Sequence, residues 1–275
     1  MTRLRAMTFN VRQMDGEDGP QVWEHRKDVL VETIRLHRPA LLGTQEIFAE
    51  QSAYILQHIP TLRCFGSGRY GDSRDKHNSI FYDREQFSLL TSGEIWISRT
   101  PEVPGSSAWD IPRPRMITWG ILRDSEGSEL FVMNTHFPYG RAADEARRQT
   151  ARLIREKLAT IPEDMPVLLT GDFNAQAGEE IYTSLTGELR DSWTTAAIRT
   201  GPEETVHGFG RFKGGRIDWI LHRNMGDVRT AETITHTMNG LYPSDHYPVC
   251  AEFDYGTRGP SGTGNRGLLR VHNSQ

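Results

Sequence analysis

The sequence predicts an α/β fold in which two packed β-sheets form a layered sandwich with helices on the outside. Three observations support this prediction. Short runs of strand type alternate with amphipathic helical segments, no linker-like stretch interrupts them, and the order of elements in the first half is loosely repeated in the second. With 275 residues, the chain can bury a substantial core.

The first part of the chain predicts a strand–helix–strand–helix unit. Residues 4–11 alternate apolar and polar side chains, as a strand does. Residues 24–37 carry apolar side chains at helical spacing and stop before Pro39. Residues 40–44 form a short apolar strand, and residues 48–59 a helix that the next proline terminates.

The middle of the chain is rich in strands. A charged loop and a proline-rich irregular segment are expected over residues 66–78 and 101–114. Short runs of strand type bounded by turn residues predict strands over residues 79–82, 94–98, 116–122 and 130–135.

The last part alternates between helices and strands again. Apolar spacing predicts helices over residues 142–158 and 179–185, and strands over 166–170, 216–221 and 247–253. We expect a mobile Gly- and Thr-rich loop over residues 194–215 and a disordered tail over residues 256–275. We therefore predict a single domain over residues 1–255.

The composition is typical of a soluble globular protein, with 36% hydrophobic and 25% charged residues. No apolar run approaches the roughly 20 residues of a membrane helix, and we find no signal peptide. Cys64 and Cys250 form no metal-binding pair by spacing, so we expect a reduced, cytoplasmic location. Because the net charge is −4, any recognition of phosphate has to be local.

Polar side chains follow several of the predicted strands. Asp172 and Asn174 close the apolar strand 166–170 and point the same way on extended backbone. A buried carboxylate is costly unless it is paired, protonated or near a cation, so Asp172 is a candidate for chemistry. Similar polar groups end other strands or lie on loops, namely Asn10, Glu46, Asn134 with His136, and Asp218 with Asp245 and His246.

This set of side chains is rich in carboxylates and amides. It contains no serine or cysteine nucleophile in a recognisable elbow. Carboxylate and amide oxygens suit a hard cation such as Mg²⁺ or Mn²⁺, whereas zinc more often takes several His or Cys ligands. One Mg²⁺ held by one or two carboxylates is typical of sites that act on phosphate. The residues therefore indicate a metal-dependent phosphoesterase.

Six short motifs occur in order along the chain: Thr8-Phe9-Asn10-Val11, Gly43-Thr44-Gln45-Glu46, Asn134-Thr135-His136-Phe137, Gly171-Asp172-Phe173-Asn174, Arg216-Ile217-Asp218-Trp219-Ile220 and Ser244-Asp245-His246. Together they resemble the endonuclease/exonuclease/phosphatase superfamily. The forms at residues 43–46 and 78–82 are similar to a bacterial subgroup of metal-dependent hydrolases. The resemblance implies a four-layer α/β/β/α sandwich of two mixed sheets, the DNase I-like fold.

The resemblance also implies a role for each matching residue. Glu46 would be the principal metal ligand, with Asn10 beside it, and Asp245 would lie near the metal. Asp172 would orient or deprotonate the attacking water. Asn174 would hold that water or a phosphate oxygen.

Four further residues would act on the phosphate or support those that do. His246 would bind the phosphate or serve as acid or base, oriented by Asp218. His136 and Asn134 would contact the phosphate. Arg115 lies in the proline-rich loop, where it could reach a substrate phosphate bidentately or merely solvate the loop.

Structural roles remain open for the same residues. Glu46 could open the following helix, where negative charge suits the helix dipole. His136 could be a packed core histidine, and Asp218 could pair with Arg216. Residues 244–246 could form an ordinary turn.

Two other functions compete with the phosphoesterase. One is a non-catalytic protein that binds a phosphate ligand on the same fold. The other is a glycosidase with Glu46 and Asp172 as paired carboxylates, which leaves the amides unexplained. For the phosphoesterase we expect a phosphorylated small molecule or a short nucleic acid as substrate, with no membrane and no obligate protein partner.

Overall fold

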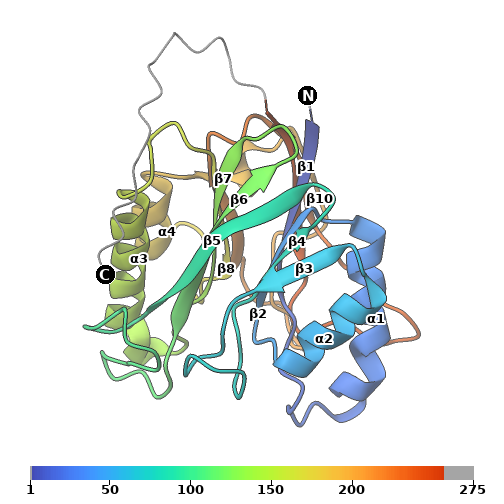
Figure 1. Ribbon diagram of the computed structural model, residues 1–275. Coiled ribbons are helices and arrows are strands. Elements are labelled where there is room, and N and C mark those ends of the chain that lie inside the picture. The colour runs from blue at the N-terminus through green and yellow to red at the C-terminus, as the bar shows by residue number, and fades with distance from the viewer. Residues whose placement is uncertain (1, 257–275) are drawn as a thin grey trace.

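Two β-sheets pack face to face between two layers of helices (Figure 1). The computed structural model describes residues 2–256. Helices α1 (Trp23–His37) and α2 (Ala49–His58) cover one sheet, and α3 (Asp144–Leu158) and α4 (Glu180–Thr186) cover the other. The predicted four-layer α/β/β/α sandwich is confirmed. Apart from Gly256, the predicted tail lies outside the described residues, and the single domain over residues 1–255 stays a prediction.

Both sheets are mixed. The seven-stranded sheet has the order β10-β12-β13-β1-β2-β4-β3 and the six-stranded sheet the order β5-β6-β7-β8-β11-β9. The strands of the first are β1 (Thr2–Asn10), β2 (Leu41–Gln45), β3 (Leu62–Phe65), β4 (Ile80–Asp83), β10 (Ile198–Thr200), β12 (Val228–Thr233) and β13 (Val249–Tyr255). Those of the second are β5 (Phe87–Trp96), β6 (Met116–Asp124), β7 (Glu129–His136), β8 (Val167–Asp172), β9 (Arg190–Asp191) and β11 (Asp218–Arg223). The pairs β1–β2 and β7–β8 are parallel.

All of the predicted helices and strands are present, with shifted ends. The sequence missed four strands, β3, β9, β10 and β12. The loop predicted over residues 194–215 is wrong at its start, where α5 (Ser192–Thr195) ends and β10 pairs with β12. All three residues of β10 are exposed, so no apolar pattern marks this strand. Within residues 2–256, no helix has the length and apolar character to span a membrane.

The inner faces of the two sheets are apolar at one end of the sandwich. Leu4 and Ala6 of β1 pack there with Val132 of β7 and Leu168 of β8. Side chains that face the other way, such as Phe9, pack beneath the helices. This arrangement follows from the two-residue repeat of a strand.

The same inner faces become polar toward the other end. Along β1 the residues facing inward after Ala6 are Thr8 and Asn10, and along β7 they are Asn134 and His136. In β8 they are Thr170 and Asp172. All of these side chains are buried. The strand pattern therefore carries polar groups into the space between the sheets, at the end where β1, β7 and β8 finish.

The amide of Asn134 joins the two sheets. Its Nδ2 donates to the backbone oxygens of Thr44 at 2.7 Å and Ser79 at 3.1 Å. Its Oδ1 accepts from Gln45 Nε2 at 2.6 Å and from Thr170 Oγ1 at 3.1 Å. The side chain is fully buried, and both donors and both lone pairs are used. Asn134 has no capacity left for a substrate phosphate, so we assign it this structural role instead.

Candidate active site

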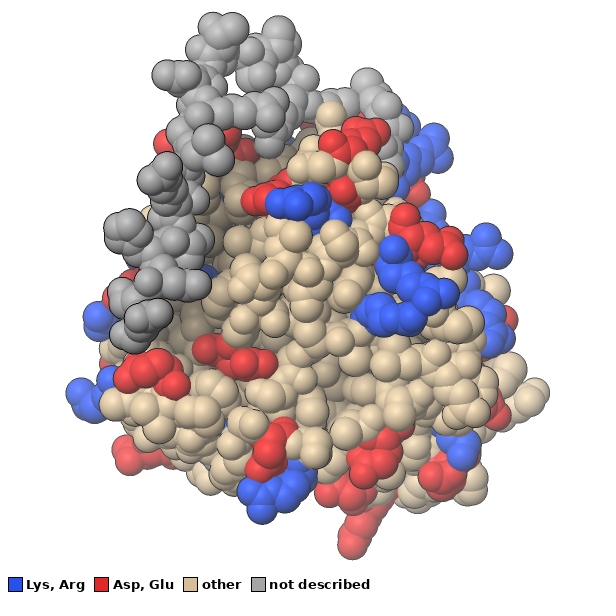
Figure 2. Space-filling model, viewed as in Figure 1, with Lys and Arg blue, Asp and Glu red and all other residues tan. Residues whose placement is uncertain are grey.

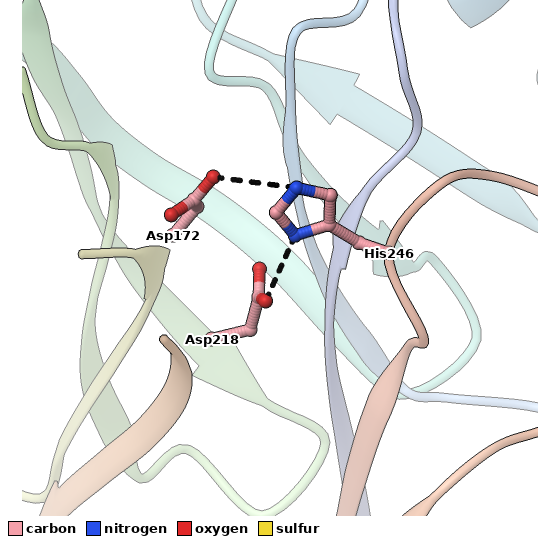
Figure 3. Close-up of side chains that lie close together, drawn as sticks. All are labelled: Asp172, Asp218 and His246. Atoms are coloured by element: carbon pink, nitrogen blue, oxygen red, sulfur yellow. Dashed lines mark hydrogen bonds and ion pairs between the residues drawn. The ribbon is translucent and has the colours of Figure 1, made fainter. Parts of the chain in front are cut away.

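Asp172, Asp218 and His246 meet at the polar end of the sandwich (Figure 3). The antiparallel register of β8 and β11 places Asp172 opposite Asp218. His246 Nδ1 lies 2.9 Å from Asp218 Oδ2, and His246 Nε2 lies 4.0 Å from Asp172 Oδ2. Arg216 pairs with Asp191 at 2.7 Å. The alternative pairing of Asp218 with Arg216 is therefore wrong.

Burial and neighbouring charges shift the pKa of two of these groups. Burial, and then the Asp218 carboxylate, raise the pKa of Asp172 to about 7. Burial alone would lower the pKa of His246, but Asp218 and then Asp172 outweigh it and raise the pKa to about 10. Near neutral pH, His246 is therefore an imidazolium, and Asp172 is poised to gain or lose a proton.

Neighbouring polar groups fix the position of the Asp172 carboxylate. Asn10 Nδ2 donates to Oδ2 at 3.0 Å, and the backbone N–H of Asn174 donates to Oδ1 at 3.0 Å. Asn174 has a left-handed φ of 46°, and its Nδ2 donates to the carbonyl of Phe137 at 3.0 Å. These contacts tie the end of β8 to β1 in the other sheet and to the segment after β7.

His136 completes the surroundings of Asp172. Its Nε2 lies 3.4 Å from Asp172 Oδ2. Burial, and then the positive charge of Arg115, hold the pKa of His136 well below its usual range. The ring is therefore neutral near pH 7 and contacts the carboxylate, which is more than a packing role.

Glu46 lies just beyond the end of β2, next to β1. Its φ is 61°, and its Oε2 accepts from Lys76 Nζ at 3.0 Å and from the backbone N–H of Gln13 at 3.4 Å. Burial raises the pKa of Glu46, but Lys76 outweighs it and lowers the pKa to about 2. Helix α2 begins at Ala49, so Glu46 does not open it. Glu46 is an ionised group at the site end of β2.

Asp245 contacts the segment that follows Asn10. Its Oδ2 is 3.7 Å from Arg12 Nη1, and Arg12 also pairs with Asp18. The neighbouring Ser244 Oγ donates to the Asn10 carbonyl at 2.6 Å. Residues 244–246 are therefore bonded to β1 and to β11, which an isolated turn would not be.

Arg26 of α1 holds the loops around the site in place. It is fully buried, and its five N–H groups donate to backbone carbonyls. The acceptors are Gln21 at 3.1 Å, Val11 at 2.7 Å, Pro243 at 2.9 Å, Arg12 at 2.8 Å and Gln13 at 3.2 Å. The first residues after Asn10 and the residue before Ser244 are thus attached to one side chain.

Sequence reasoning missed Arg26, Arg69 and Lys76. All three are less than one-tenth exposed. Arg69 and Lys76 lie in the segment predicted as a charged loop, and nothing in their spacing separates a buried cation from a solvated one. The one sequence signal for Arg26 is that a tryptophan and aliphatic residues surround it in the predicted helix, which indicates that this part of the helix faces inward.

The donor set fits a hard divalent cation. In the part of the chain that the structure describes, Asp218 Oδ1 is buried without a hydrogen-bond partner. Glu46 Oε1 accepts no hydrogen bond from any described residue. A buried carboxylate oxygen without a partner is costly, so a cation that prefers oxygen ligands suits Asp218 Oδ1. Glu46 Oε1 is free to accept such a cation as well. Asn10, which donates to Asp172 at 3.0 Å, adds an amide oxygen, a ligand type that hard cations also prefer.

Comparison with known proteins agrees with this geometry. The sequence model of the Endonuclease/Exonuclease/phosphatase family matches residues 7–246. A solved endonuclease/exonuclease/phosphatase from Bacteroides vulgatus is 30% identical, with a TM-score of 0.87 over 93% of this chain and 100% of that chain. A mannosyl-6-phosphatase from Bacteroides thetaiotaomicron is 29% identical, with a TM-score of 0.83 over 90% of this chain and 98% of that chain.

A curated relative is longer than this chain. Nocturnin from Drosophila melanogaster is 24% identical over 84% of this chain. The match covers 42% of that protein, so the chain spans less than half of its length.

Proposed function

We infer the function from the family: the chain belongs to the Endonuclease/Exonuclease/phosphatase family, and we propose that it hydrolyses phosphate esters with Mg²⁺ or Mn²⁺ by direct attack of water on phosphorus. One observation carries this proposal. The Asp172 carboxylate, with a pKa of about 7, lies 4.0 Å from an imidazolium that Asp218 holds in place.

In this proposal Asp172 takes the proton of the attacking water. A general base works best when its pKa lies near the working pH, as the pKa of Asp172 does. Asn10 and the Asn174 backbone hold its two oxygens, so the carboxylate has a fixed direction.

His246 acts on the same side of phosphorus as Asp172, because the two groups are only 4.0 Å apart. Attacking and leaving oxygens lie on opposite sides of phosphorus in an in-line displacement. His246 is therefore suited to donate from Nε2 to a phosphoryl oxygen, where negative charge builds up, rather than to protonate the leaving group. Asp218 keeps the ring charged and oriented.

Glu46 and Asn10 would hold the divalent ion, and Asp245 would lie nearby. When bound, the ion supplies positive charge that offsets the negative charge of the phosphoester. Without it, Lys76 neutralises Glu46 at 3.0 Å. We propose that a bound ion takes the place of Lys76 as the positive charge next to Glu46.

The substrate proposed from the sequence, a phosphorylated small molecule or a short nucleic acid, also has support. Acidic and basic side chains are interspersed on the face that Figure 2 shows, with no broad basic field. Long duplexes need such a field. The mannosyl-6-phosphatase neighbour favours a small substrate. We propose cytoplasmic action, with no obligate protein partner.

The experiment that tests the function uses three chromogenic substrates. Purified protein is assayed on p-nitrophenyl phosphate, bis-p-nitrophenyl phosphate and a nitrophenyl glycoside, each with Mg²⁺ or Mn²⁺ and with EDTA. We expect release from at least one phosphate ester, its loss in EDTA, and no release from the glycoside. Hydrolysis of the glycoside alone would support the paired-carboxylate glycosidase. Inactivity on every ester, including a library of sugar and nucleotide phosphates, would support the alternative of a non-catalytic protein that binds a phosphate ligand.

A matched variant tests the metal site. Glu46→Gln keeps the size of the side chain and removes its charge. We expect Mg²⁺ to raise the melting temperature of the wild type and to have little effect on the variant. An equal shift in both proteins would refute the ligand role of Glu46.

A further inference from the structure

Two guanidinium groups near the site have no partner of opposite charge in contact with them. Among the described residues, the side chains of Arg69 and Arg115 form no hydrogen bond and no ion pair. Arg69 is only 6% exposed, and Arg115 Nη1 is buried. A buried donor of a charged group without a partner is costly, which applies to Arg115 Nη1. An anion that binds here would find two guanidinium groups that no described carboxylate contacts.

One short stretch of backbone joins the segments that carry Arg69 and Arg115, and after burial the charge of Arg69 is the largest influence that lowers the pKa of Arg115. Trp96 Nε1 donates to the Arg69 carbonyl at 2.7 Å, and the backbone N–H of Ile97 donates to the Arg115 carbonyl at 2.8 Å. The backbone N–H of Arg69 donates to the Lys76 carbonyl at 3.2 Å. The end of β5 thus aligns the segments that carry all three cations.

These cations lie beside the candidate catalytic groups. Lys76 contacts Glu46 at 3.0 Å. After burial, the charges of Arg115, Arg69 and Lys76 are the largest influences that lower the pKa of His136. His136 in turn lies 3.4 Å from Asp172. The two guanidinium groups therefore lie close to the candidate catalytic groups.

The charges identify the kind of phosphate. Lys76 is paired with Glu46 and His246 with Asp218, whereas no described carboxylate contacts either guanidinium group. Asp75 is close enough to influence Arg69, but it forms no ion pair and accepts the backbone N–H of Lys76. A terminal phosphate carries nearly two negative charges near pH 7, because its second pKa is about 6. An internal phosphodiester carries one.

We propose that Arg69 and Arg115 bind the terminal, doubly negative phosphate of a phosphomonoester, so that this chain is a phosphomonoesterase rather than a nuclease. The guanidinium forks match phosphate oxygens in pairs, which a lysine cannot do. This inference rests on the proposed hydrolysis of phosphate esters and specifies phosphomonoesters as the substrate class.

The reaction is balanced without a further reactant. The water oxygen forms a bond to phosphorus as the ester P–O bond breaks. One water proton passes to Asp172, and the alcohol oxygen leaves on the opposite side and takes a proton from solvent. The products are inorganic phosphate and an alcohol.

The first test compares two esters of one leaving group. We expect kcat/KM for p-nitrophenyl phosphate to exceed that for bis-p-nitrophenyl phosphate about 100-fold, since loss of one strong contact to developing charge typically costs that much. A preference for the diester, or equally fast cleavage of a single-stranded oligonucleotide, would overturn the inference while leaving the proposed hydrolysis intact. Inactivity on all three would instead count against the proposed hydrolysis.

The second test changes the two arginines. Arg69→Gln and Arg115→Gln should each lower kcat/KM for the monoester at least about 10-fold more than for the diester. Arg115→Lys keeps the charge and should recover part of the loss. The control is Arg123→Gln, at the exposed far end of β6, which should change neither rate. Equal losses on both esters in correctly folded variants would contradict the inference.

The third test measures binding without metal and without turnover. Calorimetry at pH 8 compares inorganic phosphate, which is doubly negative, with dimethyl phosphate, which is singly negative. We expect the wild type to bind phosphate at least about 10-fold more tightly, and each Gln variant to lose this difference. Equal affinity for the two anions, or no binding of phosphate, would contradict the inference even if the enzyme hydrolyses phosphate esters.

Discussion

At the scale of single residues, the chemistry depends on how Asp172 is surrounded. Burial opposes its ionisation, while Asn10 and the Asn174 backbone favour the ionised form. The result is a carboxyl group whose pKa of about 7 lies above the 3.8 of an ordinary aspartate. The same burial that makes it a useful base also makes its charge costly to the fold.

Asp172→Asn should separate the contribution of Asp172 to catalysis from the cost of its charge to stability. We expect it to lower turnover by several orders of magnitude, because an amide cannot take the proton of water. In metal-free protein at pH 8 it should raise the melting temperature. The folded-state pKa is raised, so the wild type loses stability as pH rises from about 4 to 7, and the loss is complete at pH 8. Circular dichroism melts at pH 4 and pH 8, together with ester assays, measure both effects. Retained activity would remove Asp172 from the mechanism.

His246→Ala should lower turnover to a similar degree while leaving the secondary structure intact. The imidazolium supplies charge to a phosphoryl oxygen, and alanine cannot. His246→Gln is the matched variant, since it keeps a donor but not the charge, and should recover only part of the rate. An alanine variant with wild-type turnover would exclude His246.

Single residues also mark the limit of what the sequence could predict. Asp172, Asp218 and His246 stand in ordered motifs, and the structure brings them together. Asn134 stands in such a motif as well, yet its amide is used between the sheets. Arg69 and Lys76 could not be found, because their burial depends on how a long loop folds back on β5. Motifs locate strand ends, but not the direction of every side chain there.

At the scale of elements, α1 serves the site through a single side chain. Arg26→Met keeps a long apolar stem and removes all five donors. Each buried carbonyl left without a donor costs about 1–3 kcal/mol where water cannot replace it, so we expect a fall of several kcal/mol in the free energy of unfolding. Urea titration measures this fall.

Arg26→Lys distinguishes a positioning role from simple stability. A lysine can serve about half of the carbonyls, so it should recover folding better than turnover. If Arg26 positions Asn10 and Ser244, kcat should remain low with KM nearly unchanged when the lysine variant is fully folded. A fully active lysine variant would contradict positioning by the guanidinium fork.

Two buried histidines predict that the free energy of unfolding depends on pH. His222 in β11 is buried, with its Nε2 3.4 Å from Thr195 Oγ1, and burial followed by Arg190 lowers its pKa to about 4. The unfolded chain binds the proton first, so stability falls as pH drops from about 6.5 to 4, by about 3 kcal/mol at most. Burial lowers the pKa of His207 to about 4 as well.

His222→Gln should therefore reduce the slope of unfolding free energy against pH in this range. Urea titrations at pH 4.5, 5.5 and 7 measure it, and the remaining slope should fall further when His207→Gln is added. A slope that stays at the wild-type value in the double variant would show that neither imidazole is neutral when folded.

Three of the four strands that the sequence missed lack a clear apolar pattern of their own. β9 and β10 have two and three residues, and β10 is exposed, so neither can show an alternating pattern. β12 buries small or polar side chains such as Ala231 and Thr233 instead of large apolar ones. These strands form because longer neighbouring strands offer them hydrogen bonds. The central strands, which carry the site, were predictable because their own apolar side chains follow a strand pattern.

At the scale of the whole molecule, the site depends on how closely the two sheets approach each other. The four-layer arrangement followed from the motifs, but the sequence could not show that the two sheets approach each other closely at Gly43 of β2. A Cβ atom on Gly43 would lie 2.0 Å from Thr170 Oγ1 and 2.7 Å from Asn134 Oδ1. The polar layer that supports His136 and Asp172 therefore requires glycine at this position.

Gly43→Ala should push the sheets apart. Overpacking of this kind costs about 1–3 kcal/mol, and here it also disturbs the hydrogen bonds of Asn134. We expect a lower urea midpoint together with reduced turnover, since Thr170 and Asn134 lie two residues before Asp172 and His136. Gly187→Ala is the control, because its added Cβ would meet nothing closer than 3.6 Å.

The double variant Gly43→Ala, Thr170→Ala identifies the cause. Removing the Thr170 hydroxyl makes room for the new methyl group, so the two changes together should cost less than the sum of the separate changes. We expect the loss of unfolding free energy in the double variant to be smaller than the sum of the two single losses by at least about 0.5 kcal/mol, which exceeds the usual additivity error. Strictly additive losses would mean that Gly43→Ala acts through the strand backbone alone, and that the spacing of the sheets at this point does not govern the site.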